Sequence, residues 1–487
     1  MNMKAGIIGA GIAGIATAIR LAVKGYKVDV FEANAYTGGK LSEIHLGKYR
    51  FDAGPSLFTM PHFVEDLFQL AKKDIKEYFS YKKLDIVCKY FYEDGTEITA
   101  FADKHLFAKE IEKKTGEKAE KVLNYLQKSA KKYEITASLF LEKSLHKVST
   151  WLGKDAMRGY ANLHQLEIFK TMHQANSSFF KDERLVQLFN RFATYNGSDP
   201  YQTPATLTII PHLEHNIGAF FPKGGMYAIT KSLVNLAKDL GVRFHLSTKV
   251  EKIITEGKKI KGLQINGKSL PFDVVVSNMD IVATYKHLLP EAKHPEKLLN
   301  QPKSSSALIF YWGIKQSFPN LDVHNIFFSK DYHAEFEHIF KHQSIYQDPT
   351  VYVNIGSKGE ASDAPEGCET WFVMINTPNN VGQDWDRLIG EARKNILNKL
   401  SHMLKTDIEP LIEVEGTLDA RSIEAKTFSS QGALYGNSSN NRYAAFLRHA
   451  NFSKQFDNLF FVGGSVHPGG GIPLCLSSAA ITSNLIV

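Results

Sequence analysis

The sequence predicts an α/β fold built around a parallel sheet, and three successive features near the N-terminus support this prediction. The apolar run 4–8 is typical of a short buried strand, a glycine-rich turn follows it, and 12–24 has the apolar periodicity of a helix. The run 27–31 predicts a second strand, with Gly25 placed to end the helix between them. Together these elements make one βαβ unit of a Rossmann-like sheet.

The turn between the first strand and the helix has the spacing G-x-G-x-x-G. Gly9 permits the tight turn, Gly11 lets the backbone approach a pyrophosphate, and Gly14 lets helix and strand pack closely. The phosphates of a dinucleotide would then lie at the helix N-terminus. A glycine turn that serves packing alone is the alternative. The residues between the glycines complete the expected binding loop, and they are Ala10, Ile12 and Ala13.

An acidic residue ends the second strand, where dinucleotide-binding folds place a carboxylate. Glu32 is expected to accept hydrogen bonds from both hydroxyls of an adenosine ribose, with Ala33 beside it. The strand before the turn, the helix after it and the acid beyond all agree, so a bound dinucleotide is preferred over a structural turn.

Length and composition exclude several classes of protein. The 487 residues are enough for two or three domains. The net charge of +7 does not imply binding to nucleic acid, although it is compatible with an anionic membrane surface. Three widely spaced cysteines indicate a reducing compartment, and neither a membrane-spanning apolar run nor a signal peptide is visible. We therefore expect a cytoplasmic protein.

Two more glycine turns follow Glu32, and they add backbone amides and one positive charge near the expected pyrophosphate. The second turn is expected to open a helix at its serine. A nicotinamide enzyme does not need these additions. The pattern resembles the glutathione-reductase-like, amine-oxidase-type flavoproteins, although a lysine replaces the usual arginine of Gly-Gly-Arg. That resemblance implies FAD. The residues concerned are Gly38, Gly39, Lys40 and Leu41, then Gly54, Pro55 and Ser56.

The middle of the chain predicts a second, α+β domain. Strands at 86–92 and 95–101 form a hairpin that turns at Asp94-Gly95, and 104–200 is helical and rich in charge. Further β-branched and aromatic runs predict a mixed or antiparallel sheet that joins this hairpin and walls a substrate cavity. These runs are 305–314, 325–329, 350–355 and 370–376, and a long helix follows at 384–404.

The segment 128–152 combines a basic lead-in with an apolar and aromatic set. The preferred interpretation is a helix that faces the core and has a solvated flank. A helix that dips into the membrane interface is the alternative. The apolar set is Ile135, Leu139, Phe140, Leu141, Leu145, Val148, Trp151 and Leu152.

The last motif, 458–473, contains a buried strand at 459–462 and a loop, 463–471, with five glycines in nine residues. The amides of such a loop should face a ligand. The helix N-terminus that follows suits the pyrimidine edge of a flavin, where negative charge develops on reduction. The residues expected at the cofactor are Gly464, Ser465, Gly471, Ile472 and Pro473.

The run from His467 to Pro473, together with the turns after Phe51 and at Gly224, resembles the bacterial phytoene-desaturase-type carotenoid desaturases. The resemblance covers both ends and the middle of the cofactor domain and is faint across 100–200 and 300–400. It implies FAD-dependent removal of two hydrogens from a saturated carbon pair beside the polyene of an acyclic carotenoid, with hydride transfer to flavin N5. No catalytic acid or base is assigned, and no metal site is expected.

This resemblance also implies a domain organisation. The FAD-binding domain would comprise 1–80, 220–282 and 408–487, with Val250 beside the adenine and Asn278 on the return to the substrate domain. The substrate-binding domain would comprise 81–219 and 283–407, with a helical lid at 104–200. Because a long hydrocarbon must enter from lipid, we expect peripheral association with the cytoplasmic face of the membrane.

The resemblance favours one subtype, the desaturases that act at the 3,4 position of a 1-hydroxycarotenoid. A phytoene desaturase, a flavin amine oxidase and a non-enzymatic carrier of isoprenoid lipids on the same fold are the alternatives. A partner for the substrate hydroxyl should lie between Tyr160 and Tyr201. The electron acceptor stays open between oxygen and a quinone.

Overall fold

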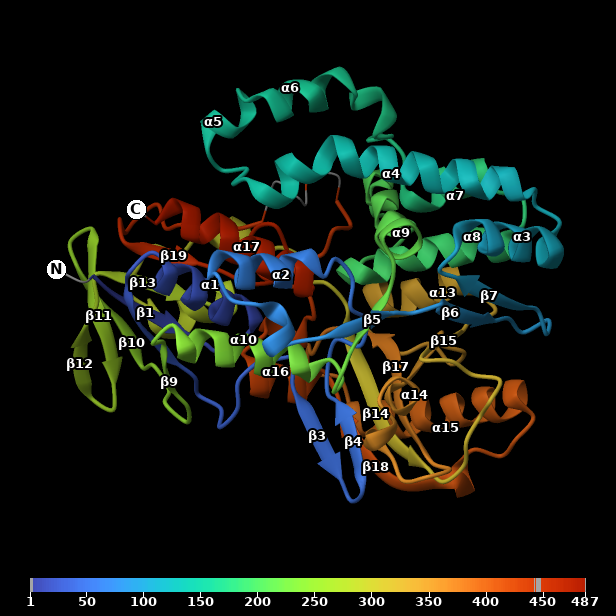
Figure 1. The fold of residues 1–487 in the computed structure, drawn as a ribbon. Coiled ribbons are helices and arrows are strands. Elements are labelled where there is room, and N and C mark those ends of the chain that lie inside the picture. The colour runs from blue at the N-terminus through green and yellow to red at the C-terminus, as the bar shows by residue number, and fades with distance from the viewer. Residues whose placement is uncertain (1–2, 442, 444–447, 487) are drawn as a thin grey trace.

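The structure, a computed structural model, describes residues 3–441, 443 and 448–486. Two sheets organise the chain: a parallel sheet on the left of Figure 1 and a larger mixed sheet on the right. This arrangement confirms the predicted α/β fold with a parallel Rossmann-like sheet and a second, mixed sheet.

The smaller of the two sheets has five short strands, and all of its pairings are parallel. Its central strands are apolar and buried on both faces, as expected of a parallel sheet that is covered on two sides. In spatial order the strands are β19 (Leu459–Phe461), β13 (Val274–Ser277), β1 (Lys4–Ile8), β2 (Lys27–Phe31) and β9 (Arg243–His245).

Helices cover one face of the parallel sheet, and a small antiparallel sheet covers the other. The helices α1, α10 and α17 share one core with the strands, and side chains such as Ile15, Leu233 and Leu476 fill it. On the opposite face, Phe31 and Val275 pack against the three-stranded sheet. The elements are α1 (Ile12–Val23), α10 (Tyr227–Asp239), α17 (Ile472–Leu485), β10 (Lys252–Glu256), β11 (Lys259–Ile265) and β12 (Lys268–Pro271).

The larger sheet has seven strands, and the pairing of β15 with β6 is its one parallel pairing among the described residues. The helix α15 (Trp385–Leu404) packs against one face through Ile396 and Leu400. The other face contributes Ile309, Phe372 and Met374 to a cavity. In spatial order the strands are β18 (Ile412–Leu418), β14 (Ser306–Ile314), β17 (Glu369–Thr377), β16 (Val351–Ile355), β15 (His324–Phe327), β6 (Ile86–Phe91) and β7 (Glu97–Phe101).

The region 104–200 is helical, as predicted, and forms the upper layer of Figure 1, where α5 and α6 make an arch above the rest of the molecule. The helices of this region are α3 (Lys104–Thr115), α4 (Ala119–Glu142), α5 (Val148–Trp151), α6 (Lys154–Ala161), α7 (Met172–Phe179) and α8 (Glu183–Asn190). The remaining helices are α2 (His62–Leu70), α9 (Ile210–His212), α11 (Ile281–Ala283), α12 (Glu296–Leu299), α13 (Tyr332–Glu337), α14 (Gly356–Gly359) and α16 (Ala420–Thr427).

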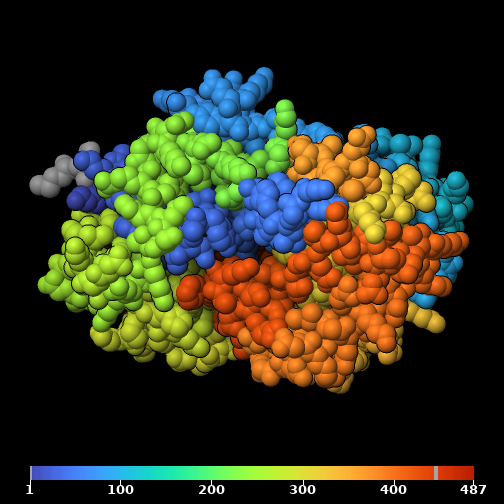
Figure 2. Space-filling model, turned by 90° about the horizontal axis from the view of Figure 1, so that it is seen from below, coloured from blue at the N-terminus to red at the C-terminus, as the bar shows by residue number. Residues whose placement is uncertain are grey.

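A hairpin reaches from the cofactor side of the molecule to the seven-stranded sheet. It consists of β3 (Glu43–Leu46) and β4 (Tyr49–Asp52), and the Tyr49 hydroxyl donates a hydrogen bond to Glu413 on β18 at 2.5 Å. Seen from below, the blue N-terminal segment and the orange-red segment after residue 400 lie side by side (Figure 2). The remaining strands, β5 (Tyr81–Lys83) and β8 (Phe220–Pro222), pair with each other.

Two local predictions differ from the structure. No helix begins at Ser56; α2 begins at His62, because residues 55–61 run across the cavity before the chain turns into the helix. The strand β18 lies in the range 408–487 that we assigned to the FAD-binding domain, yet it pairs with β14 of the larger sheet.

No helix within the described residues is both long enough and apolar enough to cross a membrane.

Candidate functional site

A cavity of about 1230 Å³ lies between the two sheets and receives residues from both. Ligand pockets commonly measure about 300 to 1,000 Å³, so this cavity has room for a dinucleotide and for part of a second ligand. Its cofactor side is lined by the glycine turns, and its other side by the larger sheet and the segment around Arg191.

The turn after β1 is built as the glycine pattern predicts, with one difference. Gly9 has a positive φ of 93°, and a Cβ at Gly14 would lie 2.2 Å from the Gly9 carbonyl oxygen, so both glycines are required. A Cβ at Gly11 would lie 2.7 Å from Asn278 Oδ1. The missing side chain at Gly11 therefore makes room for the Asn278 amide, a contact that the glycine pattern does not indicate, and the approach of a pyrophosphate to Gly11 stays a prediction.

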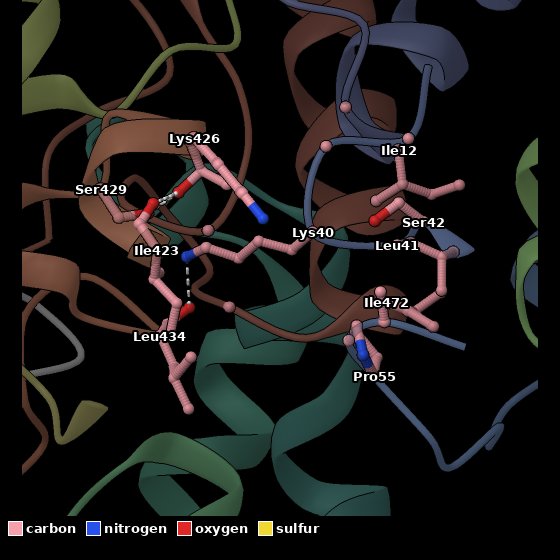
Figure 3. A pocket seen from close by; sticks show the side chains of 18 of the residues that line it. Ile12, Lys40, Leu41, Ser42, Pro55, Ile423, Lys426, Ser429, Leu434 and Ile472 are labelled. Carbon is pink, nitrogen blue, oxygen red and sulfur yellow. Dashed lines mark hydrogen bonds between the residues drawn. The ribbon is translucent and has the colours of Figure 1, made fainter. Parts of the chain in front are cut away.

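The N-terminus of α1 is open to the cavity. Its N-cap is Gly11, which has no side chain to cap the helix, and Ile12 and Ala13 line the cavity (Figure 3). The first N–H groups of a helix have no partner within the helix and carry a partial positive charge. The N–H of Gly14 donates to Asn278, whereas those of Ile12 and Ala13 have no partner among the described residues and can hold phosphate oxygens.

Glu32 lies at the end of β2 and is buried, with its carboxylate in the cavity wall. Its Oε2 accepts a hydrogen bond from the N–H of Ala10 at 2.8 Å, and its Oε1 accepts two from Asn34, at 2.9 Å each. A carboxylate has about four acceptor sites, so capacity remains for a ribose hydroxyl. The protein contacts hold the carboxylate in one orientation before any ligand binds.

The second glycine turn directs the side chain of Lys40 across the cavity. The ammonium donates hydrogen bonds to the carbonyl oxygens of Ala433 at 3.1 Å and Leu434 at 2.9 Å (Figure 3). Burial lowers the pKa of Lys40 to about 8. The negative charge of Asp280 acts in the other direction and raises this pKa, but its effect is smaller than that of burial. Lys40 thus joins the N-terminal half of the site to the segment that follows α16.

The third turn is equally tight. A Cβ at Gly54 would lie 1.9 Å from the Lys40 carbonyl oxygen, so no other residue fits there. Pro55 and Ser56 line the cavity, and the Ser56 hydroxyl shares a hydrogen bond of 2.8 Å with the Tyr352 hydroxyl. Tyr352 comes from the larger sheet, so this bond joins the two sides of the site.

The C-terminal glycine loop lines the same cavity. Gly463 and Gly471 have positive φ angles of 111° and 102°, and Ser465 accepts a hydrogen bond from the N–H of Ile281 at 2.9 Å. Gly471 is the N-cap of α17 and has no side chain to cap it, and Ile472 and Pro473 face the cavity (Figure 3). A second open helix N-terminus therefore meets the same cavity.

The structure brings the predicted cofactor residues together with two exceptions. Ala10 and Gly14 lie behind the cavity wall, where they support Glu32 and Asn278. Sequence reasoning missed the contribution of α16 and the loop after it, because no glycine or charge pattern marks them. These missed residues are Ile423, Lys426, Thr427, Phe428 and Ser429.

The substrate side of the cavity is mostly apolar and aromatic but contains one buried ion pair. Nη2 of Arg191 donates to Oε2 of Glu214 at 2.6 Å, and both residues line the cavity. His324 lies in the same wall, where its Nδ1 shares a hydrogen bond of 2.7 Å with the Tyr352 hydroxyl. Burial, with a contribution from the charge of Arg191, lowers the pKa of His324 to about 3, so this ring is neutral at physiological pH.

Within the described part of the chain, no group of three or more His, Cys, Asp or Glu side chains is placed to hold a metal ion.

Comparison with known proteins establishes the family. A family model described as flavin containing amine oxidoreductase matches residues 12–487. The chain belongs to this family. The match begins at the first residue of α1, directly after Gly9 and Gly11 of the first glycine turn, and it includes the whole C-terminal glycine loop.

Curated relatives within the family are carotenoid enzymes. A "1-hydroxycarotenoid 3,4-desaturase" from a Flavobacterium species is 53% identical over 483 residues and 99% of each chain. A "phytoene desaturase" from Fusarium fujikuroi is 32% identical over 99% of this chain and 88% of its own, and a "4,4'-diapolycopene oxygenase" from a Methylomonas species is 32% identical over 100% and 98%. The resemblance to the carotenoid desaturases is thus confirmed.

Solved structures show the same fold at low sequence identity. Putrescine oxidase bound to putrescine has a TM-score of 0.65 at 14% identity and covers 99% of this chain and 97% of its own. An oxidoreductase from Methanosarcina mazei has a TM-score of 0.64 at 15% identity, with coverage of 98% and 99%. These structures support the fold class alone.

Membership of the family makes FAD the cofactor, and the residues of the site fit it. The two uncapped helix N-termini supply donors for a pyrophosphate and for the pyrimidine edge of a flavin. Glu32 supplies an oriented carboxylate for the ribose. A Cβ at Gly38 would lie 2.1 Å from the Leu41 carbonyl oxygen, so that turn also needs glycine.

Proposed function

We propose that this chain is an FAD-dependent desaturase that introduces a carbon-carbon double bond at the 3,4 position of an acyclic 1-hydroxycarotenoid. The observation that carries the proposal is the 53% identity to the Flavobacterium enzyme of that name over nearly the whole of both chains. The relatives named phytoene desaturase are only about 30% identical, so they support the wider class and not this subtype.

The bound flavin would supply the two-electron oxidation by accepting a hydride from one carbon of the pair, while the neighbouring carbon gives up a proton that passes to solvent. The protein itself contributes by fixing the position of that carbon pair and by excluding water from it. Apolar side chains from both sides of the cavity, including Leu57, Ile309 and Phe372, exclude water around a polyene. No acid or base is needed to orient the hydrocarbon, and no catalytic side chain is assigned.

A direct test is anaerobic incubation of the purified flavoprotein with phytoene, lycopene and an acyclic 1-hydroxycarotene at equal concentrations. We expect the hydroxylated compound to bleach the flavin fastest, and the polyene absorption to move to longer wavelength as the conjugation grows. Phytoene as the best substrate would contradict the subtype and leave the desaturase class standing.

We also propose that the protein binds the cytoplasmic face of the membrane peripherally, through the arch of residues 148–170, which comprises α5, α6 and the segment that follows them. Large apolar side chains are exposed along this segment, among them Val148 (77%), Leu152 (78%) and Phe169 (83%). Exposed Lys154, Arg158 and Lys170 flank them. Apolar side chains beside cations are typical of an interfacial anchor.

For the segment 128–152 we preferred a helix that faces the core and kept a helix at the membrane interface as the alternative. Ile135, Leu139 and Leu145 are buried, so this part of 128–152 packs into the core. The exposed apolar positions begin at Val148 and continue to Phe169. Support for membrane contact therefore comes from the arch and not from α4. The electron acceptor, oxygen or a quinone, stays a prediction.

A further inference from the structure

The ion pair of Arg191 and Glu214 is an unusual feature of an otherwise apolar cavity wall. Both side chains are buried, with relative exposures of 7% and 2%. Among the described residues that line the cavity from the expected substrate domain, they are the only ones with a guanidinium, ammonium or carboxylate group. A buried ion pair is weak evidence for stability, since well-packed apolar residues often serve as well. A role in binding would explain why the pair faces the cavity.

The pair is held rigidly by its neighbours. Nε and Nη2 of Arg191 both donate to the Tyr90 hydroxyl, at 3.1 and 2.6 Å, and Nη2 also donates to Glu214. The guanidinium lies 4.2 Å from the centre of the Phe192 ring, within reach of a cation–π contact. Glu214 lies on the turn Leu213–Ile217, which follows α9 directly. Both charged groups therefore have fixed positions.

Each member of the pair keeps one polar atom without a partner. In the part of the chain that the structure describes, Nη1 of Arg191 and Oε1 of Glu214 make no hydrogen bond, although both side chains line the cavity. One of these atoms is a donor and the other is an acceptor. A hydroxyl group can accept from the first and donate to the second.

We propose that Arg191 and Glu214 bind the tertiary hydroxyl of the substrate and select hydroxylated carotenoids over plain hydrocarbons. This inference rests on the proposed function and names the recognition element for it. A hydrocarbon end would leave the donor and the acceptor buried and unpaired, which costs far more than the loss of one favourable contact. Sites built to bond a hydroxyl reject analogues that lack it by large factors.

The position of the pair agrees with the chemistry of the substrate. The carbon that carries the hydroxyl is two bonds from the nearer carbon of the 3,4 pair, so the hydroxyl must bind close to the flavin. Ser56, on the cofactor side, is joined through Tyr352 to His324 by bonds of 2.8 and 2.7 Å. Arg191 and Glu214 line the same cavity as these three residues.

Sequence reasoning located half of this site. We expected the partner of the hydroxyl between Tyr160 and Tyr201, and Arg191 lies in that range. Glu214 lies outside it, and nothing in the spacing of the two residues indicates that they meet.

The test is binding of two unreactive probes to the oxidised holoenzyme, followed through the absorbance of the flavin. The probes are 2,6-dimethyloctan-2-ol, which copies the hydroxylated end of the substrate, and 2,6-dimethyloctane. We expect the wild type to bind the alcohol more tightly by roughly 10- to 100-fold. In the double variant Arg191→Met/Glu214→Leu, which leaves no lone buried charge, this preference should fall to near unity.

Two further variants make the result specific. Glu214→Gln keeps the shape of the side chain but removes its charge, and should lose most of the preference. Lys132→Met/Glu167→Gln changes a partly buried ion pair in the same helical region that does not line the cavity, and should keep the wild-type preference. An alcohol preference that survives in the Arg191/Glu214 variants, or that is absent from the wild type, overturns the proposal.

Turnover separates this inference from the function on which it rests. If the wild type prefers the alcohol but does not desaturate a 1-hydroxycarotene, the proposed function fails while the assignment of Arg191 and Glu214 stands. If it desaturates the hydroxycarotene without any preference between the probes, the function stands and the assignment of these two residues is wrong.

Discussion

Asn278 Oδ1 accepts a hydrogen bond from the backbone N–H of Gly14 at 3.0 Å, a contact that joins positions 264 apart in the chain. The amide nitrogen of the same side chain donates to the Val462 carbonyl oxygen at 3.1 Å. Asn278 thereby ties the first glycine turn to the C-terminal glycine loop. Because a Cβ at Gly463 would lie 2.5 Å from its amide nitrogen, that glycine is required as well.

Replacement of Asn278 with leucine should therefore loosen both cofactor-binding turns at once. The buried N–H of Gly14 and the carbonyl of Val462 would lose their partners, at a cost of about 1 to 3 kcal/mol each in the free energy of unfolding. Urea unfolding and FAD titration should both show the loss. Asn300→Leu, at an exposed position, is the control. Unchanged FAD affinity in Asn278→Leu would show that the two turns keep their geometry without this link.

Replacement of Glu32 tests its predicted contact with FAD. In the structure Glu32 also accepts hydrogen bonds from the protein, so the substitution removes these contacts as well. Glu32→Ala removes the expected bond to the ribose and also the acceptor for the N–H groups of Ala10 and Asn34. FAD affinity should fall by about 1.5 to 3 kcal/mol, the range for a hydrogen bond to a charged group. Glu251→Ala, which changes an exposed carboxylate on the cavity rim, should bind FAD normally. Full flavin occupancy with unchanged affinity in Glu32→Ala would show that Glu32 does not contribute to FAD binding.

The sequence predicted which glycine turns and which acid meet at the cavity, because glycine turns, an acid after a strand and helix starts are local features. Each of them fixes the backbone within a few residues. The strands of the larger sheet were also visible in β-branched and aromatic runs, such as 370–376 for β17 (Glu369–Thr377).

What the sequence could not show depends on contacts between distant segments. Lys40 was predicted to place a positive charge beside the pyrophosphate, and nothing in the sequence indicated that its ammonium donates hydrogen bonds to the carbonyl groups of Ala433 and Leu434. The absence of a side chain at Gly11 makes room for the side chain of Asn278, which directly follows the C-terminal end of β13. The pairing of Arg191 with Glu214 likewise depends on how α8 and α9 pack, which no single segment encodes.

The pH dependence of stability can be tested at His215. Its ring stacks on Phe107 with centroids 4.5 Å apart, and neither ring nitrogen has a partner among the described residues. Burial, with a smaller contribution from Arg191, lowers the pKa of His215 to about 3, below its ordinary value of 6.5. Between these two pH values the unfolded chain binds a proton that the folded chain does not, so stability falls as the pH drops from 6.5 toward 3.

His215→Phe should remove this acid-sensitive contribution while keeping the stacked ring. At pH 7.5 the variant should be at least as stable as the wild type, and at pH 5 it should gain about 1 to 2 kcal/mol relative to it. Urea unfolding at the two pH values measures the difference. His45→Phe, at an exposed position, should show no comparable gain. An equal effect of His215→Phe at both pH values would mean that His215 titrates normally in the folded protein.

The arch of residues 148–170 carries the last prediction, which concerns the membrane. Leu152 and Phe169 are among the most exposed large apolar side chains of the described residues, and burial of such groups in a bilayer is worth about 1.5 to 3 kcal/mol each. The double variant Leu152→Asp/Phe169→Asp should therefore lose most of its binding to anionic liposomes in a sedimentation assay. Wild-type binding should weaken as salt rises, because Lys154 and Arg158 contribute by charge.

The control variant is Val381→Asp, which introduces a negative charge at an apolar position that is 53% exposed and lies outside the arch. It should bind like the wild type. Equal loss of binding in both variants would mean that the added negative charge, and not the arch, controls binding. Equal recovery of the wild type in the supernatant with and without liposomes would refute membrane association.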